Sequence, residues 1–338
     1  MLDYGQNIVH GKVRNLFKSL FAAHTPKDVV VIGSRTSFDK AYDMVDFSDI
    51  HCRFCTSEQV PFEDYLYRAG QDRAEVYVGF GGGTAIDIAK YLAKKNDAQC
   101  IAIPTMLSTN VFATDKVAEI TPEGKFTTLG VLPSAIWVDE SLLMLSKEQN
   151  LYGFADVFSI GTALQDWLLA EEQKKDNVDM NIYQETIHIM FDAMDLVEKY
   201  GKNIPSSEMF KVICRSGYVT NKYGSGRPES GSEHILAKEI EKLIYVPHGL
   251  AVTCGIAIMT QVQPVSMVVT NLLPDTIKRL GLYDEVKRHI EKDILYKAIS
   301  NVKPRPDRYT IIDYHSNLDK DFFVNQADYL IEKSGLYD

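Results

Sequence analysis

Short apolar runs alternate with amphipathic stretches through the first part of the chain. The run at 28–33, DVVVIG, is rich in β-branched residues and stops at a glycine, as a buried parallel strand typically does. Runs of this kind predict strands at 28–33, 52–56, 74–80 and 100–104, with helices beginning near 38 and spanning 62–69 and 85–93. Because strands and helical patterns alternate, we expect βαβ units and a Rossmann-like parallel sheet.

From about residue 152 onward, apolar positions repeat at helical spacing over longer stretches. They predict helices at 157–170, 183–200, 207–218, 235–243 and 248–260, and no strand is expected among them. The change of character near 145–152 marks a domain boundary. We therefore predict an α/β domain at 1–149 and an all-α domain at 150–338, which suits the length of 338 residues at ~100–200 residues per domain.

Composition and charge narrow the range of functions. A hydrophobic content of 45% and a charged content of 24% are typical of a globular protein. The formal net charge of −10 argues against a nucleic-acid-binding surface. The most apolar run, at 250–259, is shorter than the ~20 residues that cross a membrane. The chain has five scattered cysteines, and no export signal is expected in it. Together these features predict a cytoplasmic protein with reduced thiols.

A glycine-rich turn in the first domain is a candidate phosphate site. Gly81, Gly82 and Gly83 lie between an expected strand and helix, where backbone N–H groups and the helix dipole favour a phosphate. The alternative is a tight turn without a ligand, since the spaced GxGxxG pattern is absent. Thr84 would add a hydroxyl group. Asp87 belongs to the same candidate site or forms a solvated ion pair with Lys90.

A second candidate loop follows the strand expected at 100–104. Ligands of open α/β sheets bind at the carboxyl ends of the strands, so Thr105 and Ser108 are candidates for cofactor contacts. A capping turn without a ligand is the alternative.

Two histidines in the second domain suggest a metal site. His234 ends RPESGSEH, His248 follows Pro247, and the two lie on separate expected helices. Imidazole is a common ligand of zinc, nickel, copper and iron, and a catalytic zinc usually has three protein ligands. A cap or core role is the alternative for either histidine taken singly.

Together these stretches resemble the superfamily of iron-containing alcohol dehydrogenases, glycerol dehydrogenases and dehydroquinate synthases. The pyrophosphate-binding motif of that superfamily is similar to GFGGGTAIDIAK at 79–90, and its next segment to IPTMLST at 103–109. The glycerol-1-phosphate dehydrogenase branch is similar in GFAD at 153–156, TALQDWLLA at 162–170, RPESGSEH at 227–234, PHG at 247–249 and DRYTII at 307–312.

The resemblance implies a dehydroquinate synthase-like fold with the active site in a cleft between two domains. It implies one metal ion, zinc or else nickel or iron, on Asp156, His234 and His248. It also implies phosphate contacts at Gly81, Gly82 and Gly83, with Thr105 and Ser108 near a nicotinamide. Homo-oligomers are common in this superfamily, so we expect one here.

Two departures from the family pattern bear on the chemistry. The glycerol and glycerol-phosphate dehydrogenases have an Asp where this chain has Asn110, and an amide cannot take a proton from a hydroxyl group. Asp115, nearby in sequence, is the candidate for an alternative proton route. Where many NAD-preferring relatives carry an acid, this chain has Ser34 and Arg35, and an arginine can meet the 2′-phosphate of NADPH.

The function expected from these features is reduction of a small phosphorylated ketone, such as dihydroxyacetone phosphate, by NADPH or NADH. Arg227 and Lys116 are candidates for the substrate phosphate, and a solvated surface role is the alternative for each. The rival enzyme class is a sugar-phosphate cyclase of the dehydroquinate synthase type, which uses NAD transiently. A catalytically silent nucleotide- or metal-binding protein is a third possibility.

Overall fold

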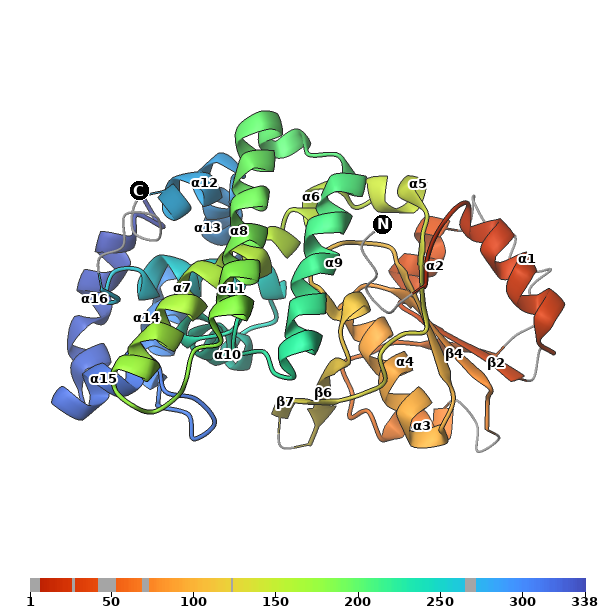
Figure 1. Ribbon diagram of the computed structural model, residues 1–338, viewed down its shortest axis with the longest axis horizontal. Helices are drawn as coiled ribbons and strands as arrows, with labels where there is room; N and C mark the ends of the chain where they lie inside the picture. The colour runs from red at the N-terminus through yellow and green to blue at the C-terminus, as the bar shows by residue number, and fades with distance from the viewer. Residues whose placement is uncertain (1–6, 26–27, 42–52, 69–72, 123, 265–271) are drawn as a thin grey trace. The chain divides into compact units, whose positions relative to one another are not determined.

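The computed structural model describes residues 7–25, 28–41, 53–68, 73–122, 124–264 and 272–338, and it divides the chain into two compact units. The first unit is Met1–Asn150 and the second is Leu151–Asp338. Strands are confined to the first unit in the ribbon of Figure 1, and helices make up the second.

A parallel sheet forms the centre of the first unit. Its strands lie in the order β1-β8-β5-β4-β2-β3, and every neighbouring pair is parallel. The strands are β1 (Asn7–His10), β2 (Val29–Gly33), β3 (Arg53–Thr56), β4 (Val76–Gly81), β5 (Gln99–Pro104) and β8 (Ala135–Val138). The predicted Rossmann-like sheet is thereby confirmed, although residue 52 of the expected second strand lies outside the described residues.

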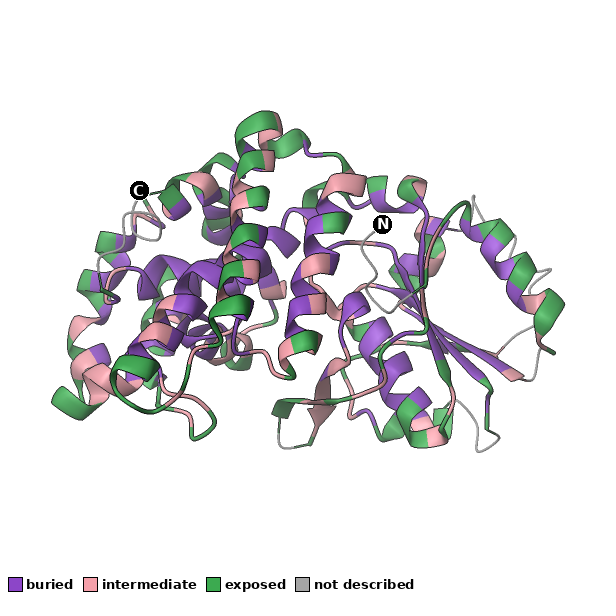
Figure 2. Cartoon of the chain, in the orientation of Figure 1, coloured by how far each residue is buried: buried purple, intermediate pink, exposed green. Residues whose placement is uncertain are grey.

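Two apolar cores cover the two faces of this sheet. Along β2, Val30 and Ile32 belong to one core and Val29 and Val31 to the other, because successive side chains of a strand point to opposite faces. Figure 2 shows the central strands β2, β4 and β5 as buried along most of their length. The helices of the unit are α1 (Val13–Ala23), α2 (Arg35–Ala41), α3 (Asp64–Arg68), α4 (Gly83–Asn96), η3 (Val111–Ala113), α5 (Glu140–Met144) and α6 (Lys147–Asn150).

The first unit also contains elements that no apolar run predicts. An antiparallel hairpin joins β6 (Lys116–Thr121) to β7 (Gly124–Leu129), and most residues of β7 are exposed. Strand β1, Asn7–His10, lies at the edge of the sheet and is not fully buried either. Exposed or edge strands need no continuous apolar stretch, so hydropathy alone does not find them.

The second unit is helical throughout its described residues, apart from an isolated bridge between Arg305 and Arg308. Its helices are α7 (Gly153–Glu172), α8 (Met180–Tyr200), η4 (Gly201–Asn203), α9 (Ser206–Tyr223), α10 (Ser232–Leu243), α11 (His248–Met259), α12 (Leu273–Arg279), α13 (Leu282–His289), α14 (Lys292–Asn301), α15 (Ile311–Leu318) and α16 (Phe322–Ser334). The predicted helical second half is confirmed.

Helix α11 packs closely on its neighbours through two glycines. A Cβ at Gly255 would lie 2.2 Å from the carbonyl oxygen of Glu233 on α10, and a Cβ at Gly249 would lie 2.2 Å from the carbonyl oxygen of Tyr152. Only glycine allows such an approach of two backbones. The contact at Gly255 fixes α11 against the first turn of α10.

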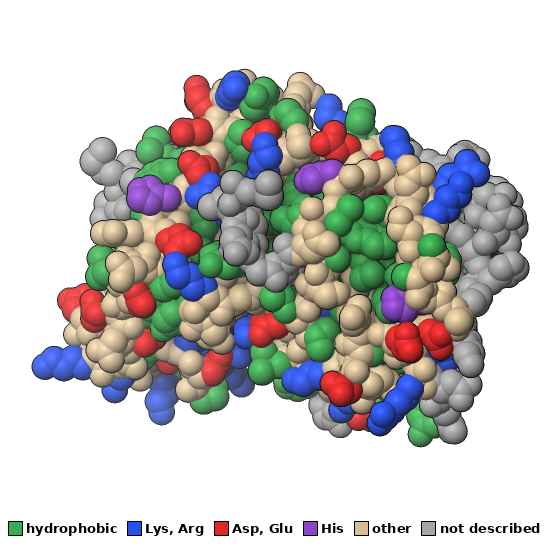
Figure 3. Space-filling view, turned by 45° about the vertical axis from the view of Figure 1, so that its right-hand side comes forward, with side chains coloured by type: hydrophobic (Ala, Val, Ile, Leu, Met, Phe, Trp, Pro, Cys, Tyr) green, Lys and Arg blue, Asp and Glu red, His purple; other side chains and the backbone are tan. Residues whose placement is uncertain are grey.

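The surface charges, the cysteines and the apolar helices can be compared with what the composition predicts. Acidic and basic side chains are interspersed on the face shown in Figure 3. Cys55, Cys100, Cys214 and Cys254 are buried free thiols. Among the described helices, none is long and apolar enough to cross a membrane.

Candidate metal centre

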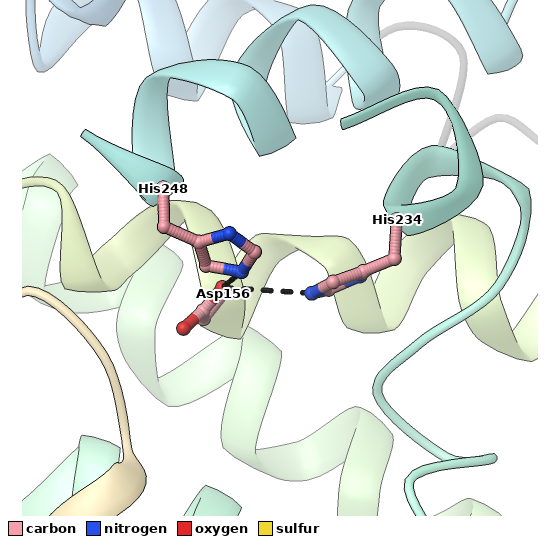
Figure 4. Close-up of side chains that lie close together, drawn as sticks. All are labelled: Asp156, His234 and His248. Atoms are coloured by element: carbon pink, nitrogen blue, oxygen red, sulfur yellow. Dashed lines mark ion pairs between the residues drawn. The ribbon is translucent and has the colours of Figure 1, made fainter. Parts of the chain in front are cut away.

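One carboxylate and two imidazoles converge in the second unit. Asp156, His234 and His248 place their ligand atoms within 4.8 Å of one another. Asp156 comes from the first turn of α7, His234 from the first turn of α10 and His248 from the first position of α11, and Figure 4 shows the three side chains pointing toward one another. The structure therefore brings together all three ligands that the resemblance implies.

The spacing of these atoms suits a shared ion better than direct hydrogen bonds. Asp156 Oδ1 lies 3.7 Å from His234 Nε2 and 3.4 Å from His248 Nε2, beyond the usual 2.7–3.2 Å of an N–H···O bond. Two ligands about 2 Å from one tetrahedral zinc ion would lie about 3.4 Å apart. No hydrogen bond to the buried Asp156 Oδ1 is found in the described part of the chain. A buried carboxylate oxygen in this position fits a divalent cation.

Two glutamates hold the outer nitrogens of the imidazoles. His234 Nδ1 lies 2.7 Å from Glu233 Oε1, and His248 Nδ1 lies 2.6 Å from Glu241 Oε1. A carboxylate can only accept, so each Nδ1 carries a hydrogen, and each Nε2, which faces Asp156, is the nitrogen left for a metal ion. Partners of this kind fix the tautomer and the orientation of metal-binding histidines.

The electrostatics of the cluster also call for a cation. Burial alone would raise the pKa of Asp156, but the neighbouring charges of His248 and His234 outweigh it and hold that pKa well below its usual value. Burial alone would lower the pKa of His248, but Glu241 and Asp156 raise it to about 10. A divalent ion bound here would displace the Nε2 protons of the two imidazoles, and its charge would take their place in balancing the carboxylates of Asp156, Glu233 and Glu241.

A further buried carboxylate supports the first turn of α10. Asp166 Oδ2 accepts a hydrogen bond from the Ser232 N–H at 2.6 Å, and Asp166 Oδ1 accepts one from the Ile311 N–H at 2.9 Å. Burial and the charge of Glu233 raise the pKa of Asp166 to about 6. Asp166 thus ties the chain just before His234 to α7 and to the start of α15.

The glycine turn of the first unit has the features of a phosphate cradle. Helix α4 begins at Gly83, and its N-cap, Gly82, supplies no side-chain hydrogen bond to the first turn. N–H donors at an uncapped helix start can bind phosphate. The Thr105 N–H donates to the Gly81 carbonyl at 3.0 Å, so the two candidate loops lie at the same edge of the sheet.

Ser37 joins two further candidates to this edge, although no pattern in the sequence indicates a role for it. Its hydroxyl lies 2.8 Å from that of Ser34 and 3.4 Å from that of Thr105. Ser34 precedes the first turn of α2, where Arg35 has a side chain that is 90% exposed and 4.0 Å from Asp39. A guanidinium group this exposed, with only a distant and exposed carboxylate as partner, is accessible to a ligand.

The ion pair between Asp87 and Lys90 is buried, so the alternative prediction of a solvated ion pair is wrong. Lys90 Nζ lies 3.1 Å from Asp87 Oδ1, and both side chains are almost fully buried. Lys90 also donates to the Val111 carbonyl at 2.8 Å, and Asp87 Oδ2 accepts from the Ala118 N–H at 3.2 Å. These bonds fasten α4 to β6, which gives Asp87 a structural task, while Thr84 is exposed on the first turn of α4.

The candidates for proton transfer and for a substrate phosphate are distributed over both units. Asn110 is the N-cap of η3, and Ser108 is half-buried just before it. Asp115 Oδ1 forms an ion pair with Lys116 Nζ at 2.9 Å. These residues belong to the first unit, whereas the metal ligands belong to the second.

Arg227, in the second unit, is not the solvated surface residue that the alternative interpretation expects. It is 4% exposed. Its Nε donates to Asp176 at 3.1 Å, and its Nη2 donates to the carbonyl oxygens of Asp166 and Tyr309. These bonds support a structural role for Arg227 between α7 and the segment that precedes α15.

Known structures share the fold of this chain. The fold is shared by a probable glycerol dehydrogenase from Sinorhizobium meliloti, with a TM-score of 0.74, 16% identity and coverage of 97% of each chain. It is also shared by an iron-containing alcohol dehydrogenase from Thermotoga maritima, with a TM-score of 0.63, 16% identity and coverage of 93% of this chain and 97% of the other.

Sequence relatives carry the assignment further. The family described as iron-containing alcohol dehydrogenase matches residues 10–145. A glycerol-1-phosphate dehydrogenase [NAD(P)+] from Methanococcus aeolicus is 30% identical over 265 residues, which are 70% of this chain and 72% of the relative. Another, from Methanocorpusculum labreanum, is 29% identical over 280 residues, 77% of this chain and 72% of the relative. The chain belongs to the iron-containing alcohol dehydrogenase family, which confirms the predicted fold and enzyme class.

Proposed function

We propose that this enzyme is a metal-dependent NAD(P)H oxidoreductase that reduces a small phosphorylated ketone, such as dihydroxyacetone phosphate, to the polyol phosphate. The observation that carries the proposal is the cluster of Asp156, His234 and His248, with its unbonded Asp156 Oδ1 and both Nε2 atoms directed inward. The names of the sequence relatives support both the phosphorylated substrate and the nicotinamide cofactor.

The side chains of the second unit have distinct tasks in this proposal. Asp156, His234 and His248 hold the ion, for which zinc is the first candidate and nickel or iron the others. When bound, the metal supplies Lewis-acid polarisation of the ketone oxygen and the reduced nicotinamide supplies the hydride. Glu233 and Glu241 keep the imidazoles in the tautomer that offers Nε2.

The first unit would hold the dinucleotide at the carboxyl edge of its sheet. The backbone N–H groups at Gly81, Gly82 and Gly83 would cradle the pyrophosphate at the start of α4. Thr105 and Ser108, in the loop after β5, would contact the nicotinamide half. Arg35, exposed at the start of α2, would meet the 2′-phosphate, so we propose a preference for NADPH.

Reduction of a ketone adds a hydride to carbon and a proton to oxygen. The side-chain amide of Asn110 can donate a hydrogen bond to the substrate but cannot supply the proton. We assign the proton route to Asp115, whose carboxylate is paired with Lys116 at 2.9 Å. The proton would then come from water by way of this carboxylate.

A nicotinamide absorbance assay on metal-reconstituted protein tests the proposal. Dihydroxyacetone phosphate should cause oxidation of NADPH, and an EDTA-stripped sample should not oxidise it. No oxidation by protein that binds both metal and cofactor would overturn the assignment. Release of phosphate from phosphorylated sugars without net consumption of cofactor would indicate the cyclase alternative, but the sequence relatives named above are dehydrogenases.

A further inference from the structure

A lysine on α10 lies between the two residues of this helix that serve the metal centre. His234 is a candidate ligand, and Glu241 holds the imidazole of His248. Lys238 is four residues after His234 and three before Glu241, spacings that place side chains on one face of an α-helix. Lys238 therefore lies on the face of α10 that is turned to the centre.

Two arginines of a neighbouring loop add positive charge at Lys238. Arg305 and Arg308 face each other across the isolated bridge that precedes α15. Arg308 donates to the carbonyl of Ser230, in the turn just before α10, and so fastens the loop to this helix. Burial lowers the pKa of Lys238 most, and the charges of Arg305 and Arg308 lower it further, in keeping with the bond that holds this loop at the start of α10.

The carboxylates near Lys238 are already engaged with other cations. Asp307 is shared by Arg305 at 2.8 Å and Arg308 at 3.3 Å, and Glu241 is bonded to His248. In the part of the chain that the structure describes, no carboxylate forms an ion pair with Lys238. Its side chain is nevertheless only partly exposed, and burial with Arg305 and Arg308 lowers its pKa to about 8.

A partly desolvated ammonium group beside two guanidinium groups, without a counter-ion of its own, is suited to a dianionic ligand. We propose that Lys238, assisted by the charges of Arg305 and Arg308 in the loop bonded to the start of α10, binds the phosphate group of the substrate. This inference rests on the proposed function, since it assigns the phosphate end of the ketone substrate to a particular set of side chains.

The reach of the substrate agrees with this placement. Four residues, a rise of about 6 Å, separate His234 from Lys238 along α10. In dihydroxyacetone phosphate, a single methylene group separates the carbonyl carbon from the phosphate ester oxygen. A molecule with its carbonyl at the metal centre can therefore extend its phosphate one turn along the helix. The assignment also gives a basic group to the phosphate in place of Arg227, whose bonds are structural.

Three variants of the metal-loaded enzyme test this inference. Lys238→Gln removes the charge, Lys238→Arg keeps it, and Lys242→Gln is the matched control one turn further along α10. Lys242 is 68% exposed and paired with Glu239, so its loss should leave the kinetics unchanged. Loss of a charged hydrogen bond should raise KM for dihydroxyacetone phosphate by about 10- to 100-fold in Lys238→Gln.

The readout must separate phosphate binding from general damage. In Lys238→Gln, kcat/KM for unphosphorylated dihydroxyacetone and the metal content should stay near those of the parent enzyme, and Lys238→Arg should recover most of the loss. An unchanged KM for dihydroxyacetone phosphate in Lys238→Gln, or equal losses with both ketones, would overturn the inference.

A binding measurement distinguishes failure of the proposed phosphate site from failure of the proposed function. Inorganic phosphate, titrated calorimetrically into the metal-loaded protein, should bind the parent and Lys242→Gln at least tenfold more tightly than Lys238→Gln. This difference would uphold the anion site even if the parent enzyme reduced no phosphorylated ketone. Turnover of dihydroxyacetone phosphate with equal phosphate affinity in all three proteins would uphold the function and reject the site.

Discussion

Glu241, near the end of α10, lies 2.6 Å from Nδ1 of His248, the first residue of α11. This bond closes the connection between the two helices and directs Nε2 of His248 toward Asp156. The metal centre therefore depends on a side chain that would not itself touch the metal.

Glu241→Gln should weaken metal binding, because an amide oxygen holds the imidazole N–H less strongly than a carboxylate does. Changes of such supporting groups typically cost 10- to 100-fold in metal affinity. Competition with a chromogenic zinc chelator would measure the change. Glu239→Gln, on the same helix and paired with Lys242, is the control that should keep the parent affinity, and equal affinities in all three proteins would contradict the assignment.

His234→Ala should abolish both metal retention and turnover, since it removes one of the three proposed ligands. Elemental analysis after dialysis, beside a near-ultraviolet circular dichroism spectrum, would show whether the metal is lost from a folded protein. Full activity in this variant would show that His234 is not a ligand of a metal ion that the reaction needs.

Gly255→Ala tests the contact between α10 and α11. The added Cβ would lie 2.2 Å from the Glu233 carbonyl oxygen, so one helix must shift at a cost of about 1–3 kcal/mol in the free energy of unfolding. Gly226→Ala is the comparison, because its added Cβ meets only Ser230 at 3.9 Å. Urea denaturation of both variants should show a loss for Gly255→Ala alone. Similar curves for the two would mean that the helices are less closely packed.

Arg35→Gln should change the choice of cofactor. The exposed guanidinium is proposed to meet the 2′-phosphate of NADPH, so KM for NADPH should rise several-fold while KM for NADH stays the same. Steady-state kinetics with each cofactor would measure the two values. A parallel change in both would assign Arg35 to the stability of α2 instead.

The pH dependence of kcat/KM should report Lys238. Burial, Arg305 and Arg308 lower its pKa to about 8, against the opposing charges of Glu241 and Asp307. A lysine is charged below its pKa and neutral above it, whereas a phosphate monoester is a dianion throughout this range. The ratio of kcat/KM for dihydroxyacetone phosphate to that for dihydroxyacetone should fall as the pH rises through about 8. Lys238→Arg should remove the fall, and a ratio independent of pH in the parent enzyme would contradict the assignment.

The parts of the fold that sequence predicts are those with a continuous apolar signal. The run at 28–33 gives β2, buried on both faces, and the apolar stretch from His248 gives α11. The hairpin of β6 and β7 has no such run, because β7 is largely exposed, and periodicity therefore misses it.

Some residues of the candidate site are likewise predictable from the sequence, and others are not. The residues of the metal cluster lie in motifs that resemble those of a known family, so these residues can be identified from the sequence. Glu241 and Lys238 owe their positions to the helical face that they share with His234, and Ser37 owes its position to the meeting of α2 with the loop after β5. The presence of Glu233 beside His234 was a signal available in the sequence. Arg227 shows the converse, since a basic residue within a family motif is buried in structural bonds.

We propose that one metal ion at Asp156, His234 and His248 makes the enzyme able to reduce a phosphorylated ketone. Titration of metal-free protein with zinc, while the oxidation of NADPH by dihydroxyacetone phosphate is followed, tests it most directly. The rate should rise in proportion to the zinc added and level off at one ion per chain. A rate that is already maximal without metal, or that stays at zero when one ion per chain is bound, would contradict the account.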